Sequence, residues 1–200
     1  MVKNKLDYFK SHSFKTLDEF VIFWKPMYRY INEAKYWANI NEHQFKQYHL
    51  NELFHWKNGM TMKGSGRKER AFKTKIIGRL KLINEYKRVR AVDLDKFNNT
   101  FLDVSPVWRI FLLHIINPKK FPIYDQHIHR TYNYVHNLDW ISINTSISKK
   151  VKLDFYFKTY LPFISKLTFK DLKGLDEAFF AFGRFLNTHN QSNLLKKYSK

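Results

Sequence analysis

The stretch from Phe111 to Tyr134 constrains the fold of this chain more than any other, because it carries the signals of two consecutive helices. Pro106 stands where a helix begins, since a missing amide hydrogen costs nothing at the first helical position. Pro118 follows the end of that helix. Asp125 then stands where a second helix begins, near the positive end of the helix dipole. The stretch therefore predicts a helix, a short connection and a second helix, whose face carries Ile128, Tyr132 and Val135.

Helical spacing of apolar residues recurs along most of the chain. We expect a helix from Thr16 to Pro26, helical character from Tyr28 to Tyr36, and further helices over about 42–57, 68–89, 94–101 and 172–187, with the segment 151–160 before the last. In the last helix, Gly183 is expected to let a neighbouring helix approach closely. No strand alternation of useful length is present. Residues 1–13 are expected to form a flexible or loosely docked start, and the chain as a whole to be all-α without a significant sheet.

The charge of the chain is strongly positive and concentrated. The formal net charge is +19, from 36 Lys and Arg against 17 Asp and Glu, and twelve of the basic residues but only two acidic ones lie between Lys57 and Arg90. A solvated helix face normally mixes both signs, so this segment favours nucleic acid as a partner. The residues expected to contact nucleic acid here are Lys57, Arg67, Lys68, Lys75 and Arg79.

Several classes of site are excluded by composition. Cysteine is absent, which excludes disulfides, thiolate zinc sites and cysteine-ligated iron–sulfur clusters. His127 and His129 are two residues apart and point to different sides of a helix, so we expect no metal site and no cofactor. No apolar run reaches the length of a membrane helix, and the first ten residues lack the apolar core of a signal peptide. We therefore expect no membrane partner and a cytoplasmic location, nucleoid-associated if the protein binds DNA.

Three segments resemble a known family. FPIYDQHIHR, at residues 121–130, resembles the segment of the helix-hairpin-helix (HhH-GPD) DNA glycosylase superfamily in which a hydrophobic stretch leads into an Asp, a short polar pair and a His or Arg. LDEAFFAFG at 175–183 and LFHWKNGM at 53–60 resemble segments of small relatives of that superfamily. The resemblance implies a single two-lobed helical domain over 1–200, with a hairpin-like motif at about 101–116 and an Asp-bearing helix at about 125–136. DNA is expected across a groove between the lobes, with Asp125 at its floor.

The resemblance also implies a chemistry. Asp125 would stabilise the positive charge that develops on the sugar when an N-glycosidic bond breaks, or orient the attacking water. The base must first leave the helical stack. Candidates for its pocket are Trp56, Trp108, Tyr124 and His127, although the three larger rings also suit a hydrophobic core. Expected phosphate contacts near the motif come from Ser105, Arg109 and Arg130, with the backbone as the alternative partner of Arg130.

The chain departs from the family in its hairpin. The catalytic lysine of bifunctional members would fall at Val107, and no lysine lies between Leu102 and Asn117. The hairpin sequence LDVSPVWR also contains no glycine. The prediction is therefore a monofunctional DNA glycosylase without lyase activity. Two alternatives remain: a catalytically inactive nucleic-acid-binding protein of the same fold, and a basic helical protein that binds an acidic protein, with Asp125 as a plain N-cap.

Overall fold

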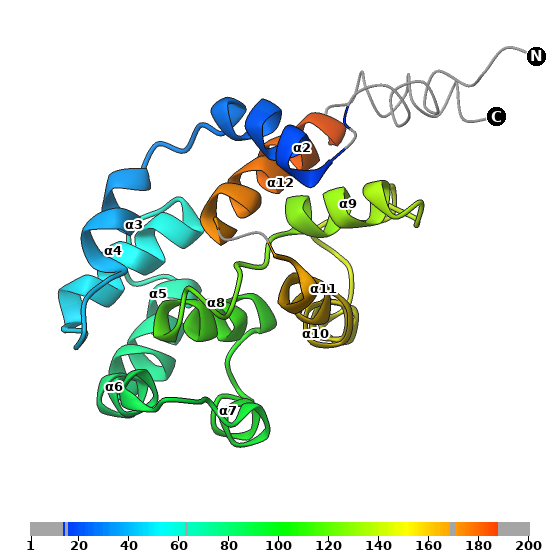
Figure 1. The fold of residues 1–200 in the computed structure, drawn as a ribbon. Helices are drawn as coiled ribbons and strands as arrows, with labels where there is room; N and C mark the ends of the chain where they lie inside the picture. The colour runs from blue at the N-terminus through cyan, green and yellow to red at the C-terminus, as the bar shows by residue number, and fades with distance from the viewer. Residues whose placement is uncertain (1–13, 15, 63, 169–170, 188–200) are drawn as a thin grey trace, which may run out of the picture. The chain divides into compact units, whose positions relative to one another are not determined.

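The computed structural model describes residue 14 and residues 16–62, 64–168 and 171–187 (Figure 1). All regular secondary structure in these ranges is helical, without a strand, which confirms the all-α prediction. The flexible start expected at residues 1–13 lies outside the described residues.

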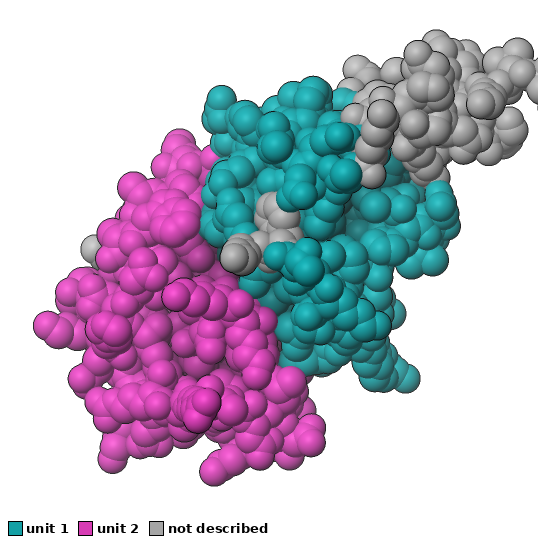
Figure 2. Space-filling view, viewed as in Figure 1, with its two compact units in different colours: residues 1–29, 122–200 teal, residues 30–121 magenta. Residues whose placement is uncertain are grey.

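The chain divides into two compact units (Figure 2). Unit 1 is discontinuous and comprises residues 1–29 and 122–200, whereas unit 2 comprises residues 30–121. The helices of unit 1 are α2 (Leu17–Trp24), η1 (Lys25–Met27), α9 (Gln126–Val135), α10 (Lys149–Asp154), η3 (Phe155–Tyr160), α11 (Leu161–Lys166) and α12 (Leu172–Leu186). Those of unit 2 are α3 (Glu33–Asn39), α4 (Gln47–Asn58), α5 (Arg67–Lys75), η2 (Ile77–Arg79), α6 (Leu80–Arg88), α7 (Leu94–Thr100) and α8 (Pro106–Ile116).

Unit 1 is built around α12, which packs against α9 and α2 (Figure 1). The contact with α2 is aromatic: the ring centroid of Phe20 lies 5.6 Å from that of Phe179 and 5.4 Å from that of Phe182, both edge-on. Such edge-to-face pairs add to the free energy already gained from burying the rings. All three side chains are buried, so this cluster forms the core that holds α9, the helix opened by Asp125.

Unit 2 is built around α8, in which every described side chain except Val107 is buried. A helix that is apolar on all sides is expected at the centre of a core. Phe54 of α4 lies 5.0 Å from Phe72 of α5, and 5.3 and 5.2 Å from Trp108 and Phe111 of α8, measured between ring centroids. The three helices α4, α5 and α8 therefore share one aromatic core.

The helix limits predicted from local signals are close to those observed. Pro106 is the first residue of α8, and α9 begins at Gln126, directly after Asp125. The helix that starts after Thr16 ends at Trp24, and Pro26 lies in the following 3₁₀ turn. Gly59, with a φ of 65°, ends α4 in the left-handed conformation that glycine adopts most readily.

The prediction of a single basic helix over 68–89 is wrong, because the helix is interrupted near Gly78. α5 ends at Lys75, a 3₁₀ turn spans Ile77–Arg79, and α6 starts at Leu80. Glycine disfavours a helix interior by about 1 kcal/mol relative to alanine. The positive charge is therefore distributed over two short helices rather than along one face of a long helix.

The helix expected from about residue 42 begins only at Gln47. Asn84 of α6 takes the place of helical hydrogen bonding at Phe45, since its side-chain oxygen accepts from the Phe45 amide at 2.7 Å and its amide donates to the Phe45 carbonyl at 2.9 Å. Helical character between Tyr28 and Tyr36 starts only at Glu33, because Tyr28 is extended. On α9, Val135 is 48% exposed and does not share the buried face expected for it.

Candidate functional site

Asp125 is the N-cap of α9. Its backbone is extended, with φ of −142° and ψ of 156°, and its Oδ1 accepts a hydrogen bond from the amide of His127 at 2.9 Å. The side chain is half-buried. A carboxylate in this position satisfies one of the unpaired amides of the first helical turn and lies at the positive end of the helix dipole. The structure thus fixes a negatively charged group at the start of a ten-residue helix.

His127 lies next to this carboxylate as a neutral imidazole. Its Nδ1 is 2.9 Å from a guanidinium nitrogen of Arg130, which can only donate, so Nδ1 accepts and carries no proton. Burial lowers the pKa of His127, while the neighbouring Asp125 acts in the opposite direction. His127 is half-buried, and its ring packs edge-on against Phe180 of α12 at 5.1 Å.

Arg130 does not lie at the surface, and of its two expected partners, phosphate and backbone, the structure shows the backbone. It is 3% exposed, and its guanidinium donates to the carbonyl oxygens of Gly183 at 3.1 Å and Ile143 at 2.5 Å, in addition to His127. A buried guanidinium needs such acceptors because its desolvation is costly. Arg130 therefore ties α9 to α12 and to the loop before α10, and its hydrogen bonds are directed inside unit 1.

Arg109 is buried as well and is not placed for a phosphate contact. It is 5% exposed, and one guanidinium nitrogen donates to the carbonyl of Asn98 at 3.2 Å. This bond joins α8 to α7 inside unit 2. Ser105, in contrast, is exposed at the start of α8 and forms no side-chain cap. Of the three expected contacts near the motif, only Ser105 is at the surface.

The segment 101–116, where the hairpin-like motif is expected, consists of the turn after α7 and of α8 in unit 2. Asp103 in this turn binds Arg79 through two hydrogen bonds of 2.7 and 3.1 Å, and the Lys75 amine lies 3.8 Å from the same carboxylate. Lys75 also donates to the Asp103 carbonyl at 2.5 Å. The Arg79 guanidinium keeps the pKa of Asp103 below its usual value. Lys75 and Arg79 are thus half-buried partners of the turn.

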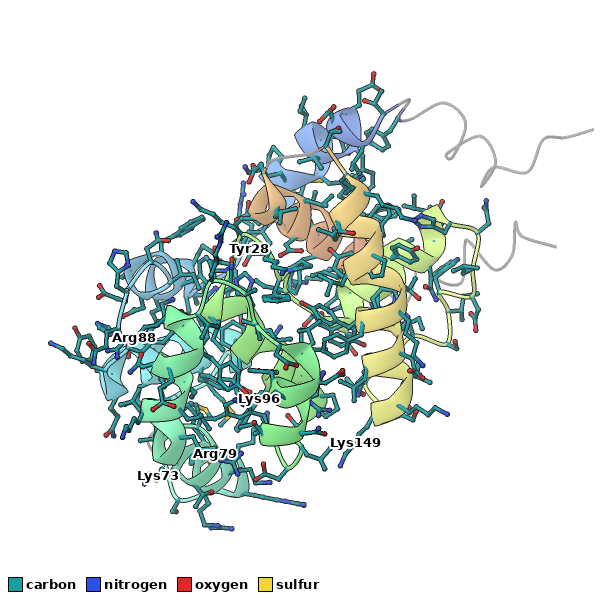
Figure 3. All side chains as sticks on the ribbon, turned by 60° about the horizontal axis from the view of Figure 1, so that its bottom comes forward. Tyr28, Lys73, Arg79, Arg88, Lys96 and Lys149 are labelled. Atoms are coloured by element: carbon teal, nitrogen blue, oxygen red, sulfur yellow. The ribbon has the colours of Figure 1, made fainter. Side chains whose placement is uncertain are left out.

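The remaining basic residues differ in exposure. Arg67 and Lys68 are exposed at the start of α5, whereas Lys57 is half-buried with its amine 5.9 Å from the ring centroid of Phe111. Further exposed cations lie along α5, α6 and α7; Figure 3 labels Lys73, Arg88 and Lys96 of this set, together with Arg79 of η2. We call the exposed set of Arg67, Lys68, Lys73, Lys81, Arg88 and Lys96 the basic surface of unit 2.

The three large rings proposed for a base pocket are buried. Trp56 and Trp108 are 5% and 8% exposed, and their indole nitrogens donate to Glu33 at 2.8 Å and to Asn58 at 3.1 Å. Tyr124 is 1% exposed, and burial raises its pKa. This burial agrees with the alternative interpretation of these rings as core side chains.

Half-buried rings on the side of His127 come instead from Phe180 and Tyr28, which were not among the predicted pocket residues. Phe180 contacts His127, and Tyr28 lies 5.6 Å from Phe180 between ring centroids (Figure 3 labels Tyr28). Cations accompany both rings: the Lys173 amine is 4.9 Å from the Tyr28 centroid and the Arg184 guanidinium is 6.0 Å from that of Phe180. No local sequence pattern indicates this group of rings, because Tyr28 is far from His127 and Phe180 in sequence and only the fold brings it close to Phe180.

Comparisons of the chain with protein-family models, curated proteins and solved structures gave no match. Every helix in the part of the chain that the structure describes is too short or too polar to span a bilayer.

Proposed function

We propose that this protein binds DNA through the basic surface of unit 2 and hydrolyses the N-glycosidic bond of a damaged or modified base, with Asp125 as the catalytic carboxylate and without lyase activity. The fold would be a two-lobed arrangement of the helix-hairpin-helix glycosylase type. The division of an all-helical chain into two compact units supports this proposal.

The observation that carries the proposal is the placement of Asp125 in FPIYDQHIHR. The carboxylate is half-buried at a helix N-terminus, next to a neutral imidazole that in turn packs against the half-buried ring of Phe180. A fixed anion of this kind stabilises a sugar that becomes oxocarbenium-like as the base departs. Tyr28, His127 and Phe180 offer apolar faces and edges against which an unstacked base could pack.

The basic surface supports the choice of DNA as the partner. Its six cations lie on the short helices α5, α6 and α7, and the segment from Lys57 to Arg90, which supplies five of them, contains only two acidic residues. Cations that contact phosphates release counterions, so the binding constant should fall with salt by a slope of roughly 0.9 per contact.

The test of catalysis is a single-turnover measurement of base release from duplexes that contain different damaged or modified bases. Asp125→Asn keeps a good N-cap residue and removes the charge, so it should bind DNA as the wild type does and release no base. Asp93→Asn makes the same change at the N-cap of α7 and serves as the matched control. Base release that survives in Asp125→Asn would refute the assignment.

The test of binding is the salt dependence of DNA affinity. Replacing Arg67, Lys68, Lys73 and Lys81 with glutamine should lower the slope of log K against log salt by roughly 2 or more. Replacing four exposed lysines of unit 1, Lys149, Lys150, Lys158 and Lys166, changes the net charge equally and should leave most of the slope. Equal effects of the two sets would remove the basic surface as the binding site.

The second candidate is a nucleic-acid-binding protein of the same fold that lacks catalysis. It is favoured by the capping bond of Asp125 to the His127 amide, which gives the carboxylate a structural role. A wild-type protein that binds DNA with a steep salt dependence and releases no base from any duplex would identify this candidate.

A further inference from the structure

The backbone that leads into Asp125 is held by buried side chains of unit 1. The Tyr156 hydroxyl donates to the carbonyl of Pro122 at 2.9 Å, and Oδ2 of Asp176 accepts from the amide of Ile123 at 3.1 Å. One carbonyl and one amide of consecutive residues are therefore fixed immediately before Tyr124 and Asp125. Because both the Pro122 carbonyl and the Ile123 amide are held, this part of the backbone cannot rotate freely.

One of the two holding groups, Asp176, is itself held by a second buried tyrosine. Oδ1 of Asp176 accepts from the hydroxyl of Tyr160 at 3.1 Å. Tyr156 and Tyr160 are 0% exposed and Asp176 is 4% exposed, so these bonds are shielded from water. Burial and the charge of Asp176 raise the pKa of both tyrosines, which keeps their hydroxyls available as donors at neutral pH. Buried polar groups that are linked in this way fix one another's positions.

Both tyrosines lie in η3, a π-helical turn at Phe155–Tyr160. Turns with i→i+5 hydrogen bonds are rare and occur frequently at functional sites. In this chain the turn presents two hydroxyl groups, one to Pro122 and one to the carboxylate that binds Ile123. This rare π-helical turn therefore supplies groups that hold the segment ending in Asp125.

We infer that Asp176, Tyr156 and Tyr160 form a positioning clamp that determines where the Asp125 carboxylate stands. None of the three is a catalytic residue; they act through the backbone of Pro122 and Ile123. The role in catalysis rests on the proposed function, whereas the restraint of the segment does not. Reacting groups must be held in place closely, because a displacement of about 1 Å can lower a rate on the order of a hundredfold.

The restraint is tested by amide hydrogen exchange in the intact protein. Tyr156→Phe and Tyr160→Phe each remove one hydroxyl and keep the ring, and Asp176→Asn keeps the shape of the side chain. Each should accelerate exchange at residues 123–127 by about tenfold or more. Tyr86→Phe is the matched control, because the Tyr86 hydroxyl bonds to Thr100 in unit 2. Exchange at residues 123–127 that is unchanged in both tyrosine variants would overturn the clamp, even if Asp176→Asn fails to fold.

The catalytic consequence is tested by single-turnover base release under saturating protein. The clamp variants should release base at least about tenfold more slowly, while the dissociation constant for DNA stays within about twofold of the wild type. A purely structural role predicts rates equal to that of Tyr86→Phe. If the wild type releases no base at all, the proposed catalysis fails, and accelerated exchange in the variants still establishes the restraint on the Asp125 segment.

Discussion

The alpha carbon of Gly183 faces the carbonyl oxygen of His127 so closely that a side chain cannot be accommodated between them. A Cβ atom built on Gly183 would lie 2.0 Å from that oxygen and 2.5 Å from the carbonyl carbon. Helices α12 and α9 therefore meet through their backbones at the first turn after Asp125. The neighbouring Arg130 bond to the Gly183 carbonyl uses the same close approach.

The first prediction concerns this contact. Gly183→Ala should lower the free energy of unfolding by about 3 kcal/mol, because the obstacle is backbone rather than a mobile side chain. Gly78→Ala is the control: its Cβ would meet only the Lys73 carbonyl oxygen at 3.5 Å, an ordinary contact distance. That variant should be as stable as the wild type or slightly more stable. Urea unfolding of both variants measures the difference, and equal stabilities would contradict the close approach.

Local signals in the sequence predict several of the helix ends, but not the start of α4 or the break between α5 and α6. Pro106 and Asp125 act within their own turns, so their effects do not depend on distant parts of the chain. The close packing expected at Gly183 is confirmed by its approach to the His127 carbonyl. The all-α class follows from the same periodic signals.

Features that depend on distant partners were not predictable. The Asn84 side chain that replaces helical bonding at Phe45 lies 39 residues away in sequence. The sequence leaves open whether Arg130 pairs with a phosphate or with the backbone, and its acceptors are the carbonyl oxygens of Ile143 and Gly183. A charged side chain can be buried when several backbone carbonyls accept its hydrogen bonds. The fold determines whether such carbonyls surround it, so the sequence alone does not predict the burial.

The second prediction separates capping from catalysis at Asp125. Asp125→Ala should lower the free energy of unfolding by about 1 kcal/mol, and Asp125→Asn by only a few tenths, since asparagine caps almost as well as aspartate. Thermal or urea unfolding provides the measurement. An increase in stability for Asp125→Ala would contradict a net stabilising cap and would instead indicate a carboxylate held at a cost, as occurs at active sites.

The third prediction is a loss of stability in mild acid. His129 is 4% exposed and stacks on Phe155 at 3.6 Å between ring centroids. Burial, with the charge of Arg130, lowers its pKa to about 4 from 6.5. The unfolded chain therefore binds the proton first as pH falls, so stability decreases between about pH 6.5 and 4, by roughly 3 kcal/mol in total.

The measurement is urea unfolding across this pH range together with NMR titration of the imidazole. His129→Phe keeps a ring against Phe155 and removes the titration, so its stability should fall less steeply over the same window. The lowered pKa of His127 acts in the same direction and leaves a smaller residual slope. A His129 titration midpoint near 6.5 in the folded protein would contradict the prediction.

The last prediction concerns the carboxylate that engages Lys75 and Arg79. Asp103→Asn should strengthen DNA binding and steepen its salt dependence, because two cations next to the basic surface of unit 2 are released. The cost in stability should stay below about 1 kcal/mol, since the pair is half-exposed and screened by solvent. The pKa of the Asp103 carboxyl is lowered in the folded state. The stabilisation that this carboxylate gives the wild type is therefore present at neutral pH and is lost in acid, as the pH falls through the lowered pKa.

The control for net charge is Asp95→Asn, which removes an exposed carboxylate from the neighbouring helix α7. Fluorescence anisotropy with labelled duplex DNA at several salt concentrations compares the two variants. Both gain one unit of positive charge, but only Asp103→Asn frees Lys75 and Arg79, so its affinity and its salt slope should exceed those of Asp95→Asn. If the two variants bind equally, the two cations do not reach the phosphates, and DNA contacts are confined to the exposed residues of the basic surface.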